Sequence, residues 1–236
     1  GTAVRIYAPA NATELIKLAQ SKGSSETTEV GALSWLSANG YYPANQVLNN
    51  IVTDGLILFL NARTSTSYPL SGTKWLDLSG EGNDATSQAS SAATTAIFDP
   101  SGYFDLNESS DVYFLISGLN NYNFGSQISI EFLMKNTGGD YRAITQNSDN
   151  SSGGSDSIDI RLGREDYYGG GNNGTRCGFT LNSDSSKAVG FPISLNVWNH
   201  VHCNYNGTVM NVYLNGELFA STSTTGNITT KANDMK

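Results

Sequence analysis

The chain has 236 residues, enough for one all-β domain or two small domains with a sizeable core. Charged residues make up only 14%, whereas Gly, Asn, Ser and Thr account for 100 residues, a composition typical of turns and strand surfaces rather than of helices. The formal net charge is −8 and no run of Lys and Arg occurs, so we expect no nucleic-acid partner. No stretch reaches the roughly 18 apolar residues of a membrane span, so we expect no membrane insertion.

Residues 1–52 predict a small helical N-terminal arm or docking module. Asn11 precedes Glu14 in a capping-box arrangement, and apolar residues then recur at helical spacing until Gly23. A second helical pattern runs over 28–38 and ends before an Asn-Gly pair, which is a favourable helix end.

From residue 53 onward, strand patterns separated by Gly, Asn, Ser and Asp clusters predict an antiparallel sandwich. Leu56–Leu60 is wholly apolar, as expected for a strand that is covered on both faces. Ile128–Met134 alternates, with apolar residues at every second position on one face. The other face of that segment carries Ser129, Glu131 and Leu133.

Two Asn-Gly pairs near the end of the chain predict consecutive hairpin turns. Asn215-Gly216 follows a strand from Val209 that alternates apolar and polar residues, and this pair tolerates the positive φ angles of a type I′ turn. Asn206-Gly207 follows a strand in which Val201, Cys203 and Tyr205 share one face. The two turns together predict an antiparallel meander.

The two cysteines, Cys177 and Cys203, allow one disulfide. Each lies in an apolar alternation, without CxxC spacing or clustered His. We therefore expect two buried free thiols.

Several segments resemble, in order along the chain, a concanavalin A-like, laminin-G-like jelly roll. They are Thr53–Ala62, Ser67–Asn83, Tyr103–Asn107, Ser110–Tyr113, Ile128–Lys135, Trp198–Val201 and Val212–Gly216. Leu133 stands where the family usually has Trp. The resemblance covers residues 53–231 and is strongest to the variant that is common in structural proteins of tailed bacteriophages. It implies a mainly β, two-sheet jelly-roll sandwich over 53–236, preceded by the helical arm.

The family pattern continues with one more strand beyond Lys236, so we expect the jelly roll to be truncated at its C-terminal end and the natural protein to continue. The chain begins with Gly1 rather than Met, which indicates a processed start or a fragment.

The loop from Asp77 to Asn83 combines glycines with short polar residues, which indicates a structural turn. Because some jelly rolls of this superfamily bind calcium through loop carboxylates, Asp77 or Asp84 as a calcium ligand is the alternative. The run Asp149–Gly153 has ligand types but lacks the alternating acidic spacing of an EF-hand loop. We expect no metal and no other cofactor, with calcium as the alternative.

Glucanases of this superfamily carry paired carboxylates at an E-x-D-x-x-E spacing, and nothing in this sequence matches it. Asp159 and Arg161 share a strand face and are expected to form an ion pair. His200 and His202 also share a face, but no third ligand lies nearby in sequence, so we expect hydrogen-bonded or exposed imidazoles rather than a metal site. The chain is therefore predicted not to be an enzyme.

The remaining candidate chemistry is binding. Predicted loops carry tyrosines with arginine and amide neighbours, a combination that suits sugar recognition by ring stacking and directional hydrogen bonds. The candidate carbohydrate-binding residues are Tyr141, Arg142, Tyr167, Tyr168 and Asn172.

The leading hypothesis is a non-enzymatic phage virion protein, displayed at the virion surface on a capsid, tail or fibre, that binds glycans or other host-surface material. Its expected partners are other virion subunits and cell-surface glycans, and the sequence leaves a homo-oligomer open. The first alternative is a purely architectural protein that binds only viral subunits. The second is a secreted bacterial carbohydrate-binding module.

Overall fold

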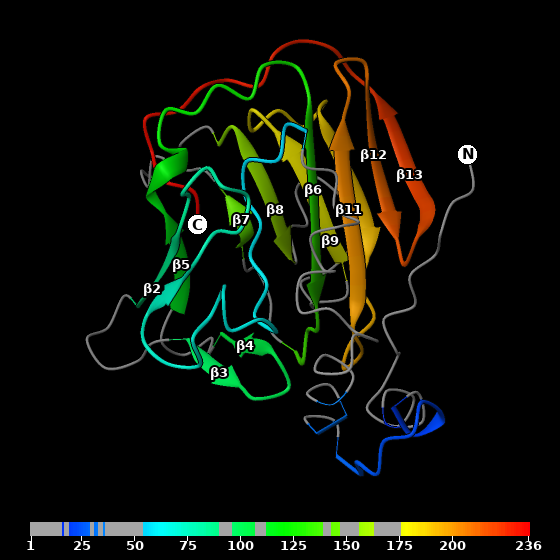
Figure 1. Ribbon diagram of the computed structural model, residues 1–236. Helices are drawn as coiled ribbons and strands as arrows, with labels where there is room; N and C mark the ends of the chain where they lie inside the picture. The colour runs from blue at the N-terminus through cyan, green and yellow to red at the C-terminus, as the bar shows by residue number, and fades with distance from the viewer. Residues whose placement is uncertain are drawn as a thin grey trace. The chain divides into compact units, whose positions relative to one another are not determined.

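The computed structural model describes residues 16, 19–28, 31–32, 35, 54–89, 96–106, 112–138, 143–146, 156–162 and 176–236. The chain divides into two compact units, residues 1–56 and 57–236 (Figure 1).

The small unit contains helical residues at 16, 19–21, 31–32 and 35. The first helical segment ends in a Schellman motif, because Gly23 N–H donates to the Gln20 carbonyl and Ser24 N–H donates to the Ala19 carbonyl, each at 3.0 Å. Gly23 has a φ of 102°, which suits glycine. The predicted helix end at Gly23 is confirmed.

The second helical segment is capped by Thr28, whose Oγ1 accepts the Gly31 N–H at 3.1 Å. This confirms the helix start that the sequence predicts at residue 28. Buried Ala19 and Ala32, with Ile16 and Trp35 beside them, form the core of this unit. The capping box at Asn11 and Glu14 lies outside the described residues.

The large unit is built on two four-stranded antiparallel sheets, which Figure 1 shows as stacked layers. In the first, the order is β13-β12-β11-β6; in the second, it is β10-β9-β8-β7. The first sheet comprises β6 (Ile128–Met134), β11 (Asn199–Tyr205), β12 (Val209–Leu214) and β13 (Glu217–Ser223). The second comprises β7 (Ala143–Gln146), β8 (Ile158–Leu162), β9 (Arg176–Leu181) and β10 (Ala188–Pro192). The predicted fold class, an antiparallel sandwich, is confirmed.

Shorter strands precede these sheets. A three-stranded sheet has the order β1-β2-β5, and β3 pairs with β4 in a two-stranded sheet. Their bounds are β1 (Lys74–Trp75), β2 (Ala85–Ala89), β3 (Ile97–Asp99), β4 (Tyr103–Asp105) and β5 (Val112–Ile116), followed by the 3-10 turn η2 (Ser117–Leu119). Near the end of the chain, Met235 is buried and bridges to Ile116 of β5.

The core lies between the facing sheets and is filled from alternate strand positions. Strand β11 has the pattern that the sequence predicts, because Val201, Cys203 and Tyr205 are buried while the residues between them are not. Cys177 of β9 is buried in the same core, and both thiols are free, as predicted. Burial raises the pKa of both thiols, so they stay protonated and unreactive at neutral pH.

The meander β11-β12-β13 follows the two predicted turns. Asn215 and Gly216 have φ angles of 52° and 89°, as a type I′ turn requires. At the other turn, the Asn206 Oδ1 accepts the N–H groups of Thr208 and Val209, at 3.0 and 2.9 Å. Both hairpins are confirmed.

The predicted strand at Leu56–Leu60 is wrong. The segment pairs with no strand: one backbone bond joins the Leu78 N–H to the Phe59 carbonyl at 2.9 Å, and side chains supply other partners. Phe59 N–H donates to Asp77 Oδ1 at 2.8 Å, and the Ile57 carbonyl accepts from Asn83 Nδ2 at 2.6 Å. The five residues are half-buried rather than covered on both faces, and an apolar run does not identify the hydrogen-bond partner that distinguishes a strand from an extended loop.

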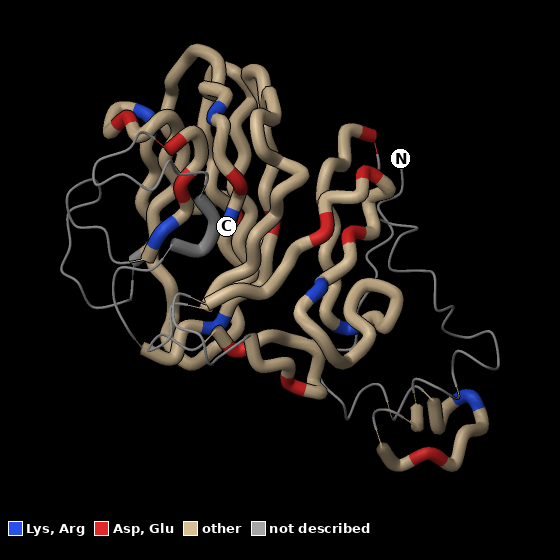
Figure 2. The backbone as a smooth tube through the Cα atoms, turned by 90° about the vertical axis from the view of Figure 1, so that its left-hand side faces the viewer, with Lys and Arg blue, Asp and Glu red and all other residues tan. Residues whose placement is uncertain are grey.

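Within the described residues, no helical segment has the length and hydrophobicity that a membrane crossing requires. Lys and Arg positions are dispersed along the described backbone rather than collected into a basic cluster (Figure 2).

Candidate functional site: the outward side of the first sheet

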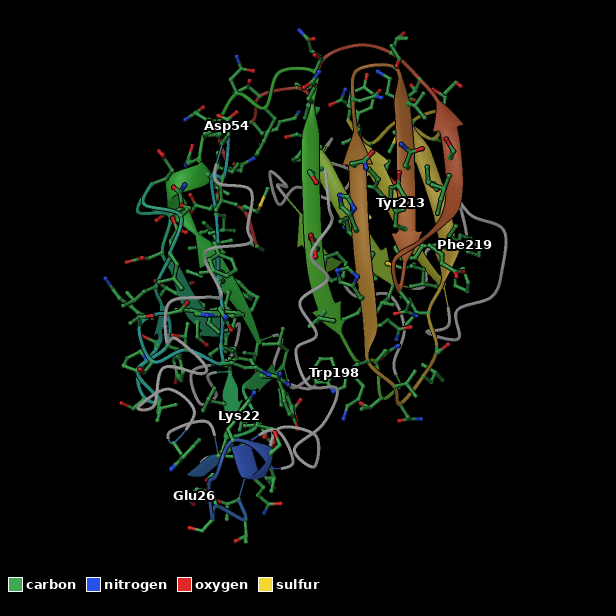
Figure 3. The ribbon with its side chains drawn as sticks, turned by 45° about the vertical axis from the view of Figure 1, so that its right-hand side comes forward. Lys22, Glu26, Asp54, Trp198, Tyr213 and Phe219 are labelled. Carbon is green, nitrogen blue, oxygen red and sulfur yellow. The ribbon has the colours of Figure 1, made fainter. Side chains whose placement is uncertain are left out.

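The outward side of the β13-β12-β11-β6 sheet carries a band of polar and aromatic side chains. It arises because residues alternate across a strand, so the buried positions of β11 leave His200, His202 and Asn204 outside. Their partners on β6 and β12 lie in register beside them. We call this surface the outer face; it comprises Ser129, Glu131, Leu133, His200, His202, Asn204, Asn211, Tyr213 and Ser221. Figure 3 shows Tyr213 on β12 within it.

One row of the outer face consists of hydroxyl and amide groups. Asn211 lies between Asn204 on β11 and Ser221 on β13 in the strand register. Its Nδ2 donates to Asn204 Oδ1 at 3.1 Å, and its Oδ1 accepts from Ser221 Oγ at 2.8 Å. An amide has two N–H donors and one oxygen. The row therefore retains donors for a ligand while its side chains are held in position.

The next two rows contain one histidine each, His202 and then His200, and the two point to one face as predicted. His202 stacks on Tyr213, with ring centroids 5.3 Å apart and planes 18° from parallel, and its Nε2 lies 2.8 Å from Ser129 Oγ. His200 Nε2 lies 2.7 Å from Glu131 Oε1. The expectation of hydrogen-bonded imidazoles is confirmed. The described residues contain no group of three or more His, Cys, Asp or Glu side chains that could hold a metal ion.

Trp198 extends the outer face beyond the start of β11. The tryptophan is 46% exposed, and Tyr103 of β4 meets its ring edge-on at 5.3 Å (Figure 3). At about 3.3 Å per residue, the distance from Trp198 to Asn204 along the strand is about 20 Å. The face is therefore long enough to contact an extended ligand along its length.

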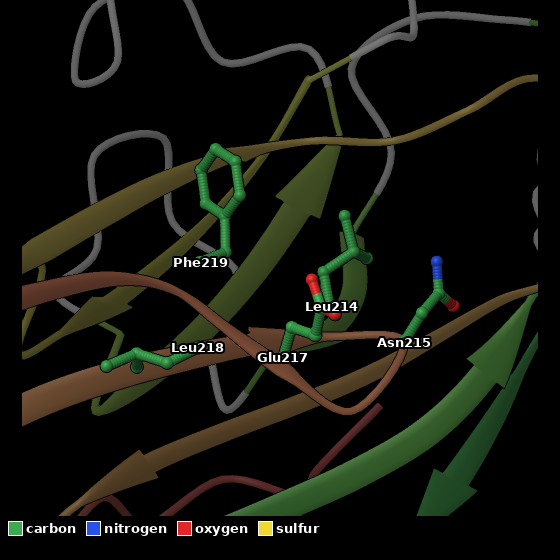
Figure 4. A pocket seen from close by; sticks show the side chains of 5 residues that line it. All are labelled: Leu214, Asn215, Glu217, Leu218 and Phe219. Carbon is green, nitrogen blue, oxygen red and sulfur yellow. The ribbon is translucent and has the colours of Figure 1, made fainter.

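The β12–β13 hairpin tip adds exposed apolar groups at the sheet edge. Val212 pairs with Ala220 but Tyr213 pairs with Leu218, so Phe219 is the extra residue of a β-bulge. Leu218 and Phe219 are both at least half exposed. They line an open hollow of about 440 Å³ together with Leu214, Asn215 and Glu217 (Figure 4).

The predicted carbohydrate-binding residues, Tyr141, Arg142, Tyr167, Tyr168 and Asn172, lie outside the described residues and stay predictions. The described strands that flank these residues show which strand ends lie together. Ala143 pairs with Arg161, and Leu162 pairs with Cys177, so the start of β7, the end of β8 and the start of β9 lie at one end of the second sheet. The sequence-based prediction places binding in loops and does not include the outer face as a candidate, although strand alternation indicates which residues lie on it.

The charged residues of β8 form a buried cluster. Arg161 Nε lies 3.2 Å from Asp159 Oδ1, and Arg161 Nη2 lies 3.8 Å from Asp156 Oδ2. Both carboxylates are almost fully buried. The predicted Asp159–Arg161 ion pair is confirmed, and the arginine also pairs with Asp156.

The Asp77 loop is held by its own hydrogen bonds. Asp77 Oδ1 accepts hydrogen bonds from the N–H groups of Phe59 and Ser79. Its Oδ2 accepts hydrogen bonds from the Ser79 hydroxyl and the Asn83 N–H, and the four distances are 2.6–3.0 Å. Burial acts to raise the pKa of the Asp77 carboxyl, but these hydrogen bonds outweigh it and hold the pKa below its usual value. The Asp84 Oδ1 accepts the Asp77 N–H at 2.9 Å. Both carboxylates thus have the structural role that the loop composition predicts.

A search of curated proteins finds no match. Among solved structures, the receptor-binding domain of botulinum neurotoxin type G is similar over 76% of this chain, with 20% identity and a TM-score of 0.47. This chain spans 42% of the length of that one. Domain 4 of an extracellular arabinanase from Geobacillus stearothermophilus, solved with arabinotriose, is similar over 75% of this chain and 81% of its own, with 16% identity and a TM-score of 0.49.

A family model matches residues 107–235, which is more than half of the chain. The match begins at residue 107, so the resemblance seen in Thr53–Ala62 and Ser67–Asn83 lies before it. Strands β6, β11 and β12, which carry most of the outer face, all lie inside it. The chain belongs to the concanavalin A-like lectin/glucanases superfamily.

Proposed function

We propose that this chain is a non-enzymatic protein that binds glycans through the outer face. The observation that carries the proposal is the ordered band in which the Asn204–Asn211–Ser221 row lies beside the His202–Tyr213 stack. Glycans present many hydroxyl groups, which bond to amides and imidazoles, and apolar C–H faces, which stack on rings. Membership of a superfamily that includes lectins supports carbohydrate as the ligand class.

The charges of the outer face support binding rather than hydrolysis. A retaining glycosidase needs two carboxyl groups about 5–5.5 Å apart, and an inverting one needs them about 6.5–9.5 Å apart. Strands β6, β11 and β12 contribute one outward carboxylate, that of Glu131, and it pairs with His200. We therefore assign the face no acid/base pair.

The biological setting that we propose is the surface of a tailed-bacteriophage virion, on the capsid, tail or fibre. Support comes from the ordered resemblance of segments such as Ile128–Lys135 and Val212–Gly216 to jelly rolls of phage structural proteins. In this proposal, the small helical unit attaches the protein to neighbouring virion subunits, and the sandwich is displayed to the host.

A purely architectural role is the second candidate, and one observation favours it. Leu218 and Phe219 expose apolar surface at the hairpin tip, which suits a protein neighbour better than a sugar. Under this alternative, Phe219→Ser would prevent incorporation into particles, and the unchanged chain would bind no glycan.

The test is a glycan array probed with the whole chain, followed by titration calorimetry on each glycan that binds. His202→Ala and Asn204→Ala should each weaken binding about two- to tenfold, because each removes one or two hydrogen bonds. Tyr113→Ala is the matched control. Tyr113 lies on β5, outside the outer face, so this substitution should leave the affinity unchanged. Absence of any bound glycan, with and without calcium, would refute the proposal; binding that is insensitive to both outer-face substitutions would refute the assigned face.

A further inference from the structure

A cation and two aromatic rings meet at one end of the outer face. Lys135 follows the last residue of β6, and Trp198 precedes the first residue of β11, which is the partner strand. The Lys135 Nζ lies 5.6 Å from the Trp198 ring centroid and 5.7 Å from that of Tyr103. Both distances are within the range of a cation–π contact.

Among the described residues, no carboxylate lies in direct contact with the Lys135 ammonium. None of the ion pairs formed among the described residues includes Lys135. The nearby carboxylate of Asp99 is occupied elsewhere, because its Oδ1 accepts the Ser101 N–H at 2.7 Å and its Oδ2 accepts the Tyr103 hydroxyl at 3.0 Å. The pKa of Asp99 is lowered mainly by the hydrogen bonds from Ser101, and the charge of Lys135 makes a smaller contribution in the same direction. The electrostatic field of Lys135 therefore reaches Asp99. The ammonium keeps its N–H donors for a ligand.

The Lys135 ammonium adds a positive charge beside four strands that have no Lys or Arg of their own. The sequences of β6, β11, β12 and β13 contain neither Lys nor Arg, and the chain as a whole has a net charge of −8. An anionic ligand would therefore be repelled over most of the molecule and attracted at Lys135. The exposed Trp198 ring beside it supplies a stacking platform for the apolar face of a sugar.

We propose that Lys135, Trp198 and Tyr103 form a subsite for a sugar unit that carries a carboxylate. In this subsite the sugar ring stacks on Trp198, and its carboxylate accepts hydrogen bonds from the Lys135 ammonium. Tyr103, fixed by its bond to Asp99, holds the Trp198 ring edge-on. The inference rests on the proposed glycan-binding function and specifies its ligand class.

The experiment uses two pairs of probes that share a backbone and differ in charge. The first pair is tetragalacturonate and its methyl ester, and the second is sialyllactose and its carboxyl methyl ester. Titration calorimetry with the whole chain at low salt should show the acidic member of at least one pair binding about two- to fivefold more tightly, the range of a solvent-exposed ion pair. The preference should shrink at high salt.

Variants separate the charge from the stacking. Lys135→Gln should abolish the preference and leave the affinity for the neutral member unchanged, whereas Trp198→Ala should weaken both members. Lys74→Gln, an exposed lysine on β1, is the control and should change nothing. Equal affinity for acidic and neutral members, or a preference that survives Lys135→Gln, would overturn the subsite while glycan binding stands. If none of the four probes and no array glycan binds, the subsite and the proposed function both fail.

Discussion

The outward sides of the two sheets follow the same sequence pattern but have different surroundings. On β6, Ser129, Glu131 and Leu133 alternate with core residues and are exposed. On β8, Asp159 and Arg161 alternate with core residues in the same way, yet Asp159 is only 2% exposed. The first sheet thus has one buried face, whereas β8 is buried on both.

This difference in burial changes how much a pair of polar side chains contributes to stability. The Glu131–His200 pair on the outer face is exposed, so water screens it and its contribution to stability is small. The Asp159–Arg161 pair has lost most of its hydration, so each charge depends on its partner. Of these two pairs, the one on the first sheet is accessible to a ligand, whereas the charges of β8 contribute to the stability of the fold.

The largest expected effect comes from removing the buried cation. Arg161→Met leaves the carboxylates of Asp156 and Asp159 without their arginine, and should lower the free energy of unfolding by about 3–5 kcal/mol. Urea unfolding followed by circular dichroism measures this change. Adding Asp159→Asn to the variant should restore part of the loss, because it removes one of the two buried carboxylate charges that the arginine contacted.

Glu131→Gln is the matched control on the exposed sheet. It removes one partner of a shorter side-chain contact, 2.7 Å against 3.2 Å, and should cost less than about 1 kcal/mol. If the two variants cost the same, burial does not distinguish the two sheets, and the comparison is wrong.

Asp77 tests whether hydrogen bonds alone can support a partly buried carboxylate. Asp77→Asn keeps an oxygen for Phe59 and Ser79 but places an NH2 group against the Asn83 N–H, which loses its acceptor. We expect a loss of about 2 kcal/mol in the free energy of unfolding near pH 7.

The effect of Asp77→Asn on stability should also depend on pH. Because folding lowers the pKa of Asp77 below its ordinary value of 3.8, the ionised carboxylate stabilises the fold above that value and loses this contribution as the pH falls through the folded pKa. The stability gap between the unchanged chain and Asp77→Asn should therefore narrow between pH 6 and pH 3. A gap that is constant over this range would show that the charge is not involved.

Particular residues show how far sequence reasoning reaches. Alternation correctly placed Val201 and Cys203 in the core and predicted the Asp159–Arg161 pair, because the strand period of two is a local property. It could not show that β8 is covered on its second side, since that depends on tertiary contacts. For the same reason the apolar run Leu56–Leu60 predicts a strand that the structure does not contain, and the bulge at Phe219 is not evident from the sequence.

Leu133→Trp should have the smallest effect on stability and the most informative effect on binding. Leu133 is 66% exposed and stands opposite His200, between the Trp198 end of the outer face and the His202–Tyr213 stack. An exposed substitution of this kind should change the free energy of unfolding by less than about 0.5 kcal/mol. If glycans lie along the face, the added ring should tighten binding about two- to tenfold in titration calorimetry. Tyr122→Trp, in the turn after η2, adds the same indole away from the face and should leave affinity unchanged; equal gains from both variants would mean that binding does not follow this sheet.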